Sequence, residues 1–425
     1  MSMCRRSGHE GRVTPIVAAT VCLFSLVGVS EASLAQEKLL GTHAIGGGAY
    51  FESVVFGGDG VRQVAFAGMD TVRVRRATQL LLPVTVATPL GGGWRLDVTA
   101  FHARGTVTYA EGDRGGAERT GTLSGVSDVR LRASGHVLRE SITLTVGANL
   151  PTGTSSLSST ELSTLRVLAA PGLAMGSSPV GAGFSGTFGA VYGREAGPWS
   201  LAMGASYEYR GRYQPVAALI AGAPSADFRP GAVVRTSIGA DRLVGAHRLR
   251  LVAAADVFSD DKLRGSAQAA ESGEVLPTLA TVRLGPVFSG DAQLHLAARR
   301  FRDLILYSSY LWRAAYARDG RTAAGSSGQY LAGGVRAALP LTMTSDVIMA
   351  GEGRWHSGLG VDEGMPTAGV RSASLTLGID GRRGLLSLQP YVRAQAGQLH
   401  QRGSGDDVRP SFVGLAGGLV LVSRF

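Results

Sequence analysis

The chain has 425 residues and a net charge of +10 at pH 7, and its 17% charged residues fall below the roughly 25% of ordinary globular domains. The positive charge is dispersed, without a basic cluster or interleaved aromatic residues, so nucleic acid is excluded as an expected partner. Beyond the N-terminus no apolar run is long enough for a membrane-spanning helix, and the 61 glycines favour short strands over helices.

The first 35 residues have the features of a signal peptide. Three arginines precede an apolar run at 13–29, and Ser33 and Ala35 follow at the spacing of a signal-peptidase site. The run is short for a retained membrane anchor and contains Pro15, so we predict export with cleavage after Ala35. Both cysteines lie in the segment to be removed, which leaves the exported chain without disulfides, thiolate catalysis or thiolate metal sites.

Residues 36–70 form the N-terminal segment of the exported chain. The stretch AYFESVVF at 49–56 is suited to the first strand of a sheet, followed by an external loop. The alternative is that the segment folds as a small plug. In that case the strand count would fall toward about fourteen.

From residue 71 to residue 425 the chain is built from short segments that alternate between apolar and polar positions. In the segment 141–150 every even-numbered residue is apolar, and every odd-numbered residue is Ser, Thr, Gly or Asn. The same alternation occurs in three further segments: 199–210, 374–380 and 386–395. Two-faced strands of this kind also occur in soluble sandwiches, so the period alone does not fix the architecture.

The connections between these segments alternate in length. Short ones such as 89–93 and 195–198 alternate with long polar ones such as 111–125 and 398–410. This alternation is typical of transmembrane barrels with periplasmic turns and external loops. We therefore predict an all-β protein, a transmembrane antiparallel up-and-down β-barrel of about sixteen strands in the cell outer membrane. The strands are expected to begin near residues 44, 72, 93, 126, 140, 181, 198, 229, 246, 276, 291, 328, 345, 370, 384 and 411.

Three stretches carry a more specific resemblance: MDTVRVRRATQLLLPVTVATPLGGGWRLDVTAF (69–101), GVSDVRLRASGHVL (125–138) and SITLTVGANLPTG (141–153). Their pattern is an apolar strand, a short turn, a Trp-bearing strand, a Gly-x-x-Asp strand opening and a strand ending in Leu-Pro-Thr-Gly. It resembles the barrel family labelled as associated with meta-pathway phenol degradation, which is similar to the long-chain fatty-acid channels. The resemblance implies an outer-membrane channel for small, aromatic or apolar molecules.

The connection 151–180 is the longest, and its second half, LRVLAAPGLAM at 165–175, is more apolar than an exposed loop should be. One interpretation is that it folds inward and narrows the barrel, as loops do in plugged barrels. The other interpretation is one more short hairpin. In the first case the segment would restrict the size of the solute.

Aromatic residues gather at the ends of the predicted strands. An amphipathic ring prefers the membrane–water interface, so we expect two aromatic girdles. The girdle beside the short turns is expected to contain Trp94 and Trp199. The girdle beside the long loops is expected to contain Tyr109, Tyr207, Tyr209 and Trp355.

The basic residues of the polar faces are arginines. Only two of the 42 basic residues, Lys38 and Lys262, are lysines. The side chains predicted to line the lumen are Arg73, Arg75, Arg95, Arg130, Arg132, Arg248, Arg250, Arg299, Arg354, Arg393, Glu352 and His356. A basic lumen concentrates anions and disfavours cations. The other interpretation is that these arginines pair with carboxylates such as Asp97, Asp128 and Asp256 and brace the wall.

The stretch GEGRWHSGLG contains the best candidates for catalysis, Glu352, His356 and Ser357. On a strand His356 and Ser357 face opposite sides, so they cannot form a nucleophile–base pair without a bulge. The chain has no phosphate-binding loop, no Gly-x-Ser-x-Gly elbow and no zinc spacing. We therefore predict no enzymatic activity, no metal and no cofactor.

In the final segment Val413, Leu415, Leu419, Leu421 and Phe425 share one face. A barrel has no edge, so this last strand is expected to pair with the first. Alternating apolar residues that end in Phe425 also resemble the C-terminal assembly signal of bacterial outer-membrane barrels. That resemblance implies the barrel-assembly machinery as a partner.

The predicted function is passive uptake of small solutes through the outer membrane, the solutes being small aromatic or apolar compounds or anions. Lipid and lipopolysaccharide would surround the barrel. About sixteen strands leave an open lumen unless a segment plugs it, which favours a channel. A structural or adhesive barrel without transport is the first alternative, and an outer-membrane hydrolase is the second.

Overall fold

The computed structural model describes residues 43–58, 60–66, 69–111, 116–138, 141–169, 173, 175, 181–216, 226–268, 275–358, 367–402 and 407–424. The predicted signal peptide and the terminal Phe425 lie outside these residues. Within the same ranges, no helix combines the length and the apolar character needed to cross a membrane.

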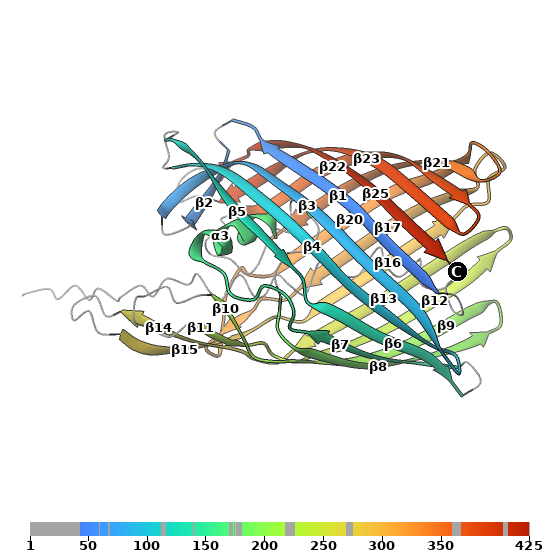
Figure 1. Cartoon of the computed structure of the whole chain (residues 1–425), viewed down its shortest axis with the longest axis horizontal. Helices are drawn as coiled ribbons and strands as arrows, with labels where there is room; N and C mark the ends of the chain where they lie inside the picture. Colours follow the sequence, from blue (N-terminus) through green and yellow to red (C-terminus); the bar gives the residue numbers. More distant parts are fainter. Residues whose placement is uncertain are drawn as a thin grey trace, which may run out of the picture.

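Sixteen antiparallel strands of the described chain close into one barrel, as predicted (Figure 1). They are β1 (Ala44–Phe56), β3 (Met69–Gly91), β4 (Trp94–Glu111), β6 (Val129–Val137), β7 (Ile142–Leu150), β8 (Ser185–Ala196), β9 (Trp199–Arg210), β12 (Val233–Val244), β13 (His247–Phe258), β16 (Val287–His295), β17 (Asp303–Arg313), β20 (Gly328–Pro340), β21 (Ser345–Ser357), β22 (Thr367–Arg383), β23 (Leu386–Arg402) and β25 (Ser411–Arg424). The barrel closes between β1 and β25, from Ala44 opposite Arg424 to Phe56 opposite Phe412. This pairing satisfies the backbone groups of both strands inside the bilayer.

Short turns and long connections lie at opposite ends of the barrel (Figure 1). The turns β3–β4, β8–β9, β12–β13 and β22–β23 each contain a glycine with positive φ: Gly92, Gly197, Gly245 and Gly384. Glycine adopts this conformation without steric cost, so two-residue reversals fit there. By the rule for outer-membrane barrels, the short turns face the periplasm and the long connections face outward.

The long-loop end carries additional strands. β2 (Val61–Phe66) pairs with β3, and β24 (Asp407–Val408) pairs with β23. A second sheet of six strands comprises β10 (Tyr213–Val216), β11 (Ala226–Arg229), β14 (Asp261–Gln268), β15 (Val275–Arg283), β18 (Ala317–Arg318) and β19 (Arg321–Thr322). Beside it, the Arg283 guanidinium donates a 2.6 Å hydrogen bond to Asp260, which lowers the pKa of that carboxyl.

The sixteen barrel strands differ at one place from those predicted. The candidate near residue 276 is β15, which belongs to the second sheet, and β17 was not among the candidates. In β17 both faces carry large apolar residues, with Ile305 and Leu311 inward and Leu306 and Trp312 outward. This composition hides the alternation on which the prediction relied.

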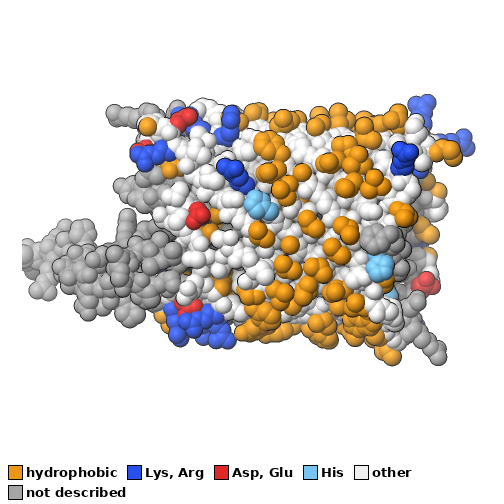
Figure 2. All heavy atoms as spheres, in the orientation of Figure 1, with side chains coloured by type: hydrophobic (Ala, Val, Ile, Leu, Met, Phe, Trp, Pro, Cys, Tyr) orange, Lys and Arg blue, Asp and Glu red, His pale blue; other side chains and the backbone are white. Residues whose placement is uncertain are grey.

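The polarity of the two barrel faces reverses along β4. In β4, Leu96 and Val98 face outward at the level of the membrane, but His102 and Arg104 are the exposed residues on that same face higher up. Figure 2 accordingly shows an apolar band over the part nearer the short turns and a paler, polar surface toward the long loops. The barrel therefore extends beyond the membrane, and its extended part has an apolar interior.

Candidate functional site

The lumen has a packed wall on the strands from β17 through β25 and β1 to β4. In its centre, Tyr307 on β17 donates a 2.8 Å hydrogen bond to Glu352 on β21. Both residues are register partners of Gly334 on the intervening strand β20. A Cβ at position 334 would lie 2.7 Å from the Tyr307 hydroxyl, so the glycine provides the space in which the phenol crosses β20.

An ion pair spans the closing strands in the same way. Arg393 on β23 binds Glu52 on β1 at 2.6 Å, and both are register partners of the small residue Ala416 on β25. Arg354 pairs with Glu352, and its charge also acts on Glu52. Ion pairs of this kind fill the lumen beside the packed wall and fix its side chains.

The packed wall continues to β4. Arg95 binds Asp97 at 2.6 Å, and the two side chains are only 7% and 13% exposed. Asp97 also stands opposite Arg132 of β6 in the strand register. On the strands that follow β4, the lumen side chains are accessible to water.

The open wall lies on the strands from β6 to β13. Its inward side chains are mostly small, among them Thr145, Gly147, Gly189, Val191, Ala202, Gly204, Ser206, Ser237 and Gly239. Val191 faces the lumen and is nevertheless 42% exposed. Arg248, paired at 2.7 Å with Asp241, is 51% exposed. Water therefore reaches the interior of the barrel along this wall.

Nine of the twelve side chains predicted to line the lumen lie on inward faces of the barrel. They are Arg95, Arg130, Arg132, Arg248, Arg250, Arg354, Arg393, Glu352 and His356. Most of the pairs formed by these arginines are with carboxylates of the same or a nearby strand. Among the described residues, Arg95, Arg248, Arg354 and Arg393 are thus neutralised, whereas Arg130, Arg132 and Arg250 form no ion pair there.

Three arginines lie elsewhere than predicted. Arg73 is on the face of β3 opposite to Val72 and Val74, which are buried inside the barrel. Arg75 lies at a bulge and donates to the carbonyl of Gly58 at 2.5 Å. Arg299 lies in the turn between β16 and β17 at the periplasmic end.

A helix, α3 (Ser159–Leu168), packs inside the long-loop end of the barrel (Figure 1). The Ser158 hydroxyl accepts from the backbone of Glu161, whose carboxylate accepts in return, and this capping box starts the helix. Leu162, Leu165 and Leu168 are all buried. For 159–168, the inward interpretation of the long connection is therefore correct and the hairpin is wrong.

Helix α3 packs against the barrel wall at two glycines. A Cβ at Gly105 of β4 would overlap the side chain of Leu168. A Cβ at Gly121 of β5 (Glu118–Val126) would lie 2.5 Å from the Thr164 hydroxyl. The helix thus rests directly on the backbone of two neighbouring strands, and larger residues would displace it.

The segment that carries α3 is tied to the wall at Asp128, between β5 and β6. The Asp128 carboxylate accepts hydrogen bonds from the backbone amides of Gly153 at 2.9 Å and Ala182 at 2.7 Å. Phe101 donates from its backbone to the Ser127 hydroxyl at 3.0 Å. In the wall-bracing interpretation of the sequence Asp128 would pair with an arginine, but its carboxylate instead binds the backbone on both sides of α3.

The aromatic side chains of both expected girdles face the membrane with one exception. Trp199 lies on the outward face of β9 beneath Arg242, 5.1 Å from its ring centre, and Trp94 begins β4 at the same end. Tyr207, Tyr209 and Trp355 are outward near the long loops. Tyr109 is buried in the apolar interior beside α3, because its strand has already left the membrane there.

The C-terminal strand presents the predicted face to the lipid. Leu419 and Leu421 point outward and are 41% and 43% exposed. Phe425 lies outside the described residues.

The candidate catalytic residues are separated by the strand geometry. His356 faces the lumen, and Ser357 faces the opposite side. In the part of the chain that the structure describes, no cluster of three or more His, Cys, Asp or Glu side chains is arranged to bind a metal.

The exchange of Gly334 for Ala is expected to destabilise the barrel by about 1–3 kcal/mol, because the new Cβ would overlap the Gly351 carbonyl oxygen and would displace the Tyr307 hydroxyl from Glu352. The matched control is Gly333→Ala, since a Cβ there has no neighbour closer than 3.6 Å. The free energy of unfolding in urea measures both. Equal stabilities of the two variants would show that the barrel accepts a side chain at position 334 without cost.

Comparisons with known proteins concern the fold. No family model and no curated protein match the sequence. The structure is similar to Pseudomonas putida OprB, with 11% identity, a TM-score of 0.45 and coverage of 90% of this chain and 94% of that chain. A mutant of TodX, a monoaromatic hydrocarbon channel, has 10% identity, a TM-score of 0.43 and coverage of 90% and 91%.

A Pseudomonas aeruginosa FadL homologue is also similar, with 10% identity, a TM-score of 0.41 and coverage of 90% of both chains. At such identities and TM-scores the likeness extends to the barrel architecture alone. The chain is an outer-membrane β-barrel.

Proposed function

We propose that this barrel is a passive channel through which small solutes enter across the outer membrane. The observation that carries the proposal is the open wall, where Gly, Ala, Ser and Thr line the interior and Val191 is 42% exposed. A barrel that served only as scaffold or adhesin would gain stability from large side chains on both walls. Residues 1–35 would direct export, and the barrel-assembly machinery and lipopolysaccharide belong to the same proposal as partners.

Liposome swelling tests this function directly. Vesicles that contain the folded barrel should swell in isotonic solutions of small sugars or amino acids, and swelling should slow as solute size increases. Folding is verified by the heat-dependent shift of mobility in a gel. A folded barrel whose vesicles do not swell would favour the structural alternative, since α3 would then close the lumen.

A modest anion preference belongs to the same proposal. Arg130 and Arg132 lie two residues apart on the inward face of β6, both are exposed, and neither forms an ion pair within the described residues. Exposed cationic side chains raise the local concentration of anions. The channel should therefore favour anions even though its other lumen arginines are mostly neutralised.

The double exchange of Arg130 and Arg132 for Gln should lower the anion preference, measured as the reversal potential in a salt gradient. Arg104→Gln is the matched control, because Arg104 is exposed on the outer surface of β4. The control should retain the reversal potential of the wild type. Cation selectivity of the wild-type channel would overturn this proposal.

A further inference from the structure

Two arginines of β6 leave their positive charge accessible inside the barrel. Arg130 and Arg132 lie two residues apart on the same inward face, and both side chains are exposed. Within the described ranges of the chain, neither guanidinium forms an ion pair or a side-chain hydrogen bond. A solute in the lumen can therefore reach both groups without displacing a partner of either.

The carboxylates beside this pair are already bound. Asp97 stands opposite Arg132 in the strand register, but it accepts a 2.8 Å hydrogen bond from Arg95 and forms an ion pair with it. Asp128 precedes Arg130 by two residues, and each of its two carboxylate oxygens accepts a hydrogen bond from a backbone amide. The pair therefore keeps most of its positive charge.

The neighbouring strand β7 presents only neutral groups at these two positions. Gly147 is the register partner of Arg132 and has no side chain, so space remains beside that guanidinium. Asn149 stands opposite the other arginine and donates its amide to Ser185 at 2.6 Å. The next carboxylate in the row of Arg132 is Glu208 on β9, with two strands between them. This side of the pair is thus open to an anion.

The spacing of the pair suits one tetrahedral dianion. Residues i and i+2 of a strand are about 6.6 Å apart. A guanidinium donates two parallel hydrogen bonds to the oxygens of a phosphate group. Two guanidinium groups at this spacing can hold one phosphate between them, and the two positive charges match its two negative charges. A monoanion would leave one of the two arginines uncompensated.

We infer that Arg130 and Arg132 together bind the phosphate group of a small phosphate monoester, an inference that rests on the proposed channel function and names one class of its solutes. Such a group carries about −1.5 to −2 charges at pH 7 and has three oxygens that accept hydrogen bonds. Each arginine donates to two of these oxygens. The rest of the solute lies in the lumen beside the small side chains of the open wall.

The test measures binding instead of conductance, so that it can fail separately from the channel proposal. Methyl phosphate is titrated by calorimetry into the folded barrel in detergent at about pH 8, where the ester is a dianion. Methyl sulfate is the tetrahedral probe with one negative charge less. Methyl phosphate should bind about tenfold more tightly, because its second charge strengthens the hydrogen bonds to the second arginine. Equal binding of the two esters, or no binding of methyl phosphate, overturns the inference.

The double variant Arg130→Lys with Arg132→Lys keeps both charges and removes the paired planar donors. It should retain the reversal potential of the wild type in a salt gradient but bind methyl phosphate about tenfold more weakly. Arg250→Gln is the matched control. Arg250 also faces the lumen without an ion pair among the described residues, but its neighbour Arg248 is bound to Asp241.

The control variant should retain the affinity of the wild type for methyl phosphate within about twofold, since a single arginine supplies only half of the contacts. If the lysine variant binds methyl phosphate like the wild type, or if the control loses as much affinity as the lysine variant, the inference is wrong. If the lysine variant fails to fold, the comparison of the two esters on the wild type still decides.

Discussion

Replacing residues 159–168 by a flexible Gly–Ser linker of equal length is expected to raise the single-channel conductance several-fold. Helix α3 occupies the long-loop end of the barrel and rests on Gly105 and Gly121, so its removal widens the entrance. The barrel should still close, because the pairing of its strands does not involve the helix. Conductance steps in planar bilayers measure the effect, and gel mobility verifies folding.

A second variant separates the helix from its attachment. Asp128→Ala removes the acceptor of the Gly153 and Ala182 amides, which costs about 1–3 kcal/mol for each buried amide left without a partner. The helix would remain but would move, so the current should fluctuate between two levels. An unchanged conductance after removal of the helix would mean that the solute path does not pass α3.

Filling the open wall is expected to abolish most of the conductance. Ala202 faces the lumen from β9, between Gly193 of β8 and Gly239 of β12. In the variant Ala202→Trp an indole ring would project into the space that these three residues leave. The current through single channels should fall by more than half, and larger solutes should be excluded first.

The matched control for this variant is the neighbouring residue of the same strand. Leu201 faces the lipid and is 44% exposed, so Leu201→Trp adds the same side chain outside the lumen. Its conductance should equal that of the wild type, since indole rings are tolerated at the lipid face. Equal conductance of both variants would place the solute path along another wall.

The alternation of residue types predicted which positions share a face, but it did not predict where the faces exchange their character. Along β4 the outward residues change from Leu96 and Val98 to His102 and Arg104. Above that level the outward face is the polar one. The prediction placed polar residues in the lumen and aromatic residues at the membrane interface along the whole strand, so it assigned Arg73 to the lumen and Tyr109 to the membrane interface. The height at which a strand leaves the membrane depends on strand tilt, which the sequence pattern does not contain.

The sequence also did not predict which polar side chains of the lumen contact each other. Tyr307 and Glu352 are separated by a whole strand, and their contact requires both the barrel register and the absence of a side chain at Gly334. Register follows from pairing between distant segments. The outward faces of β7, β9, β22, β23 and β25 depend only on local alternation and were predicted correctly.

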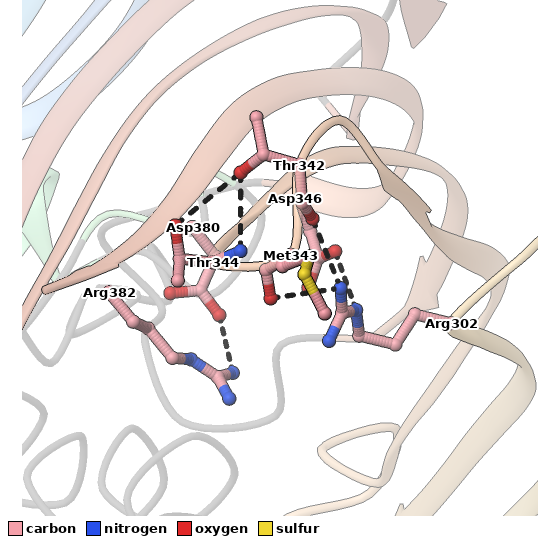
Figure 3. Close-up of polar contacts among 7 residues, drawn as sticks. All are labelled: Arg302, Thr342, Met343, Thr344, Asp346, Asp380 and Arg382. Carbon is pink, nitrogen blue, oxygen red and sulfur yellow. Dashed lines mark hydrogen bonds and ion pairs between the residues drawn. The ribbon is translucent and has the colours of Figure 1, made fainter.

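Two further arginines form ion pairs at the periplasmic end of the barrel. Arg302 binds Asp346 at 2.7 Å and donates to the carbonyl of Thr342 at 3.3 Å, while Arg382 binds Asp380 at 2.7 Å (Figure 3). The contacts of Arg302 connect the turn between β20 and β21 to the neighbouring turn before β17. They stabilise the barrel rim and leave the solute path to the side chains of the open wall.

The most direct test of the central claim is the conductance of the wild-type barrel in planar bilayers under a salt gradient. An aqueous path along the open wall predicts discrete current steps and a reversal potential that indicates a modest preference for anions. A barrel with verified fold that gives no current would contradict the account, because the lumen would then be closed over its whole length.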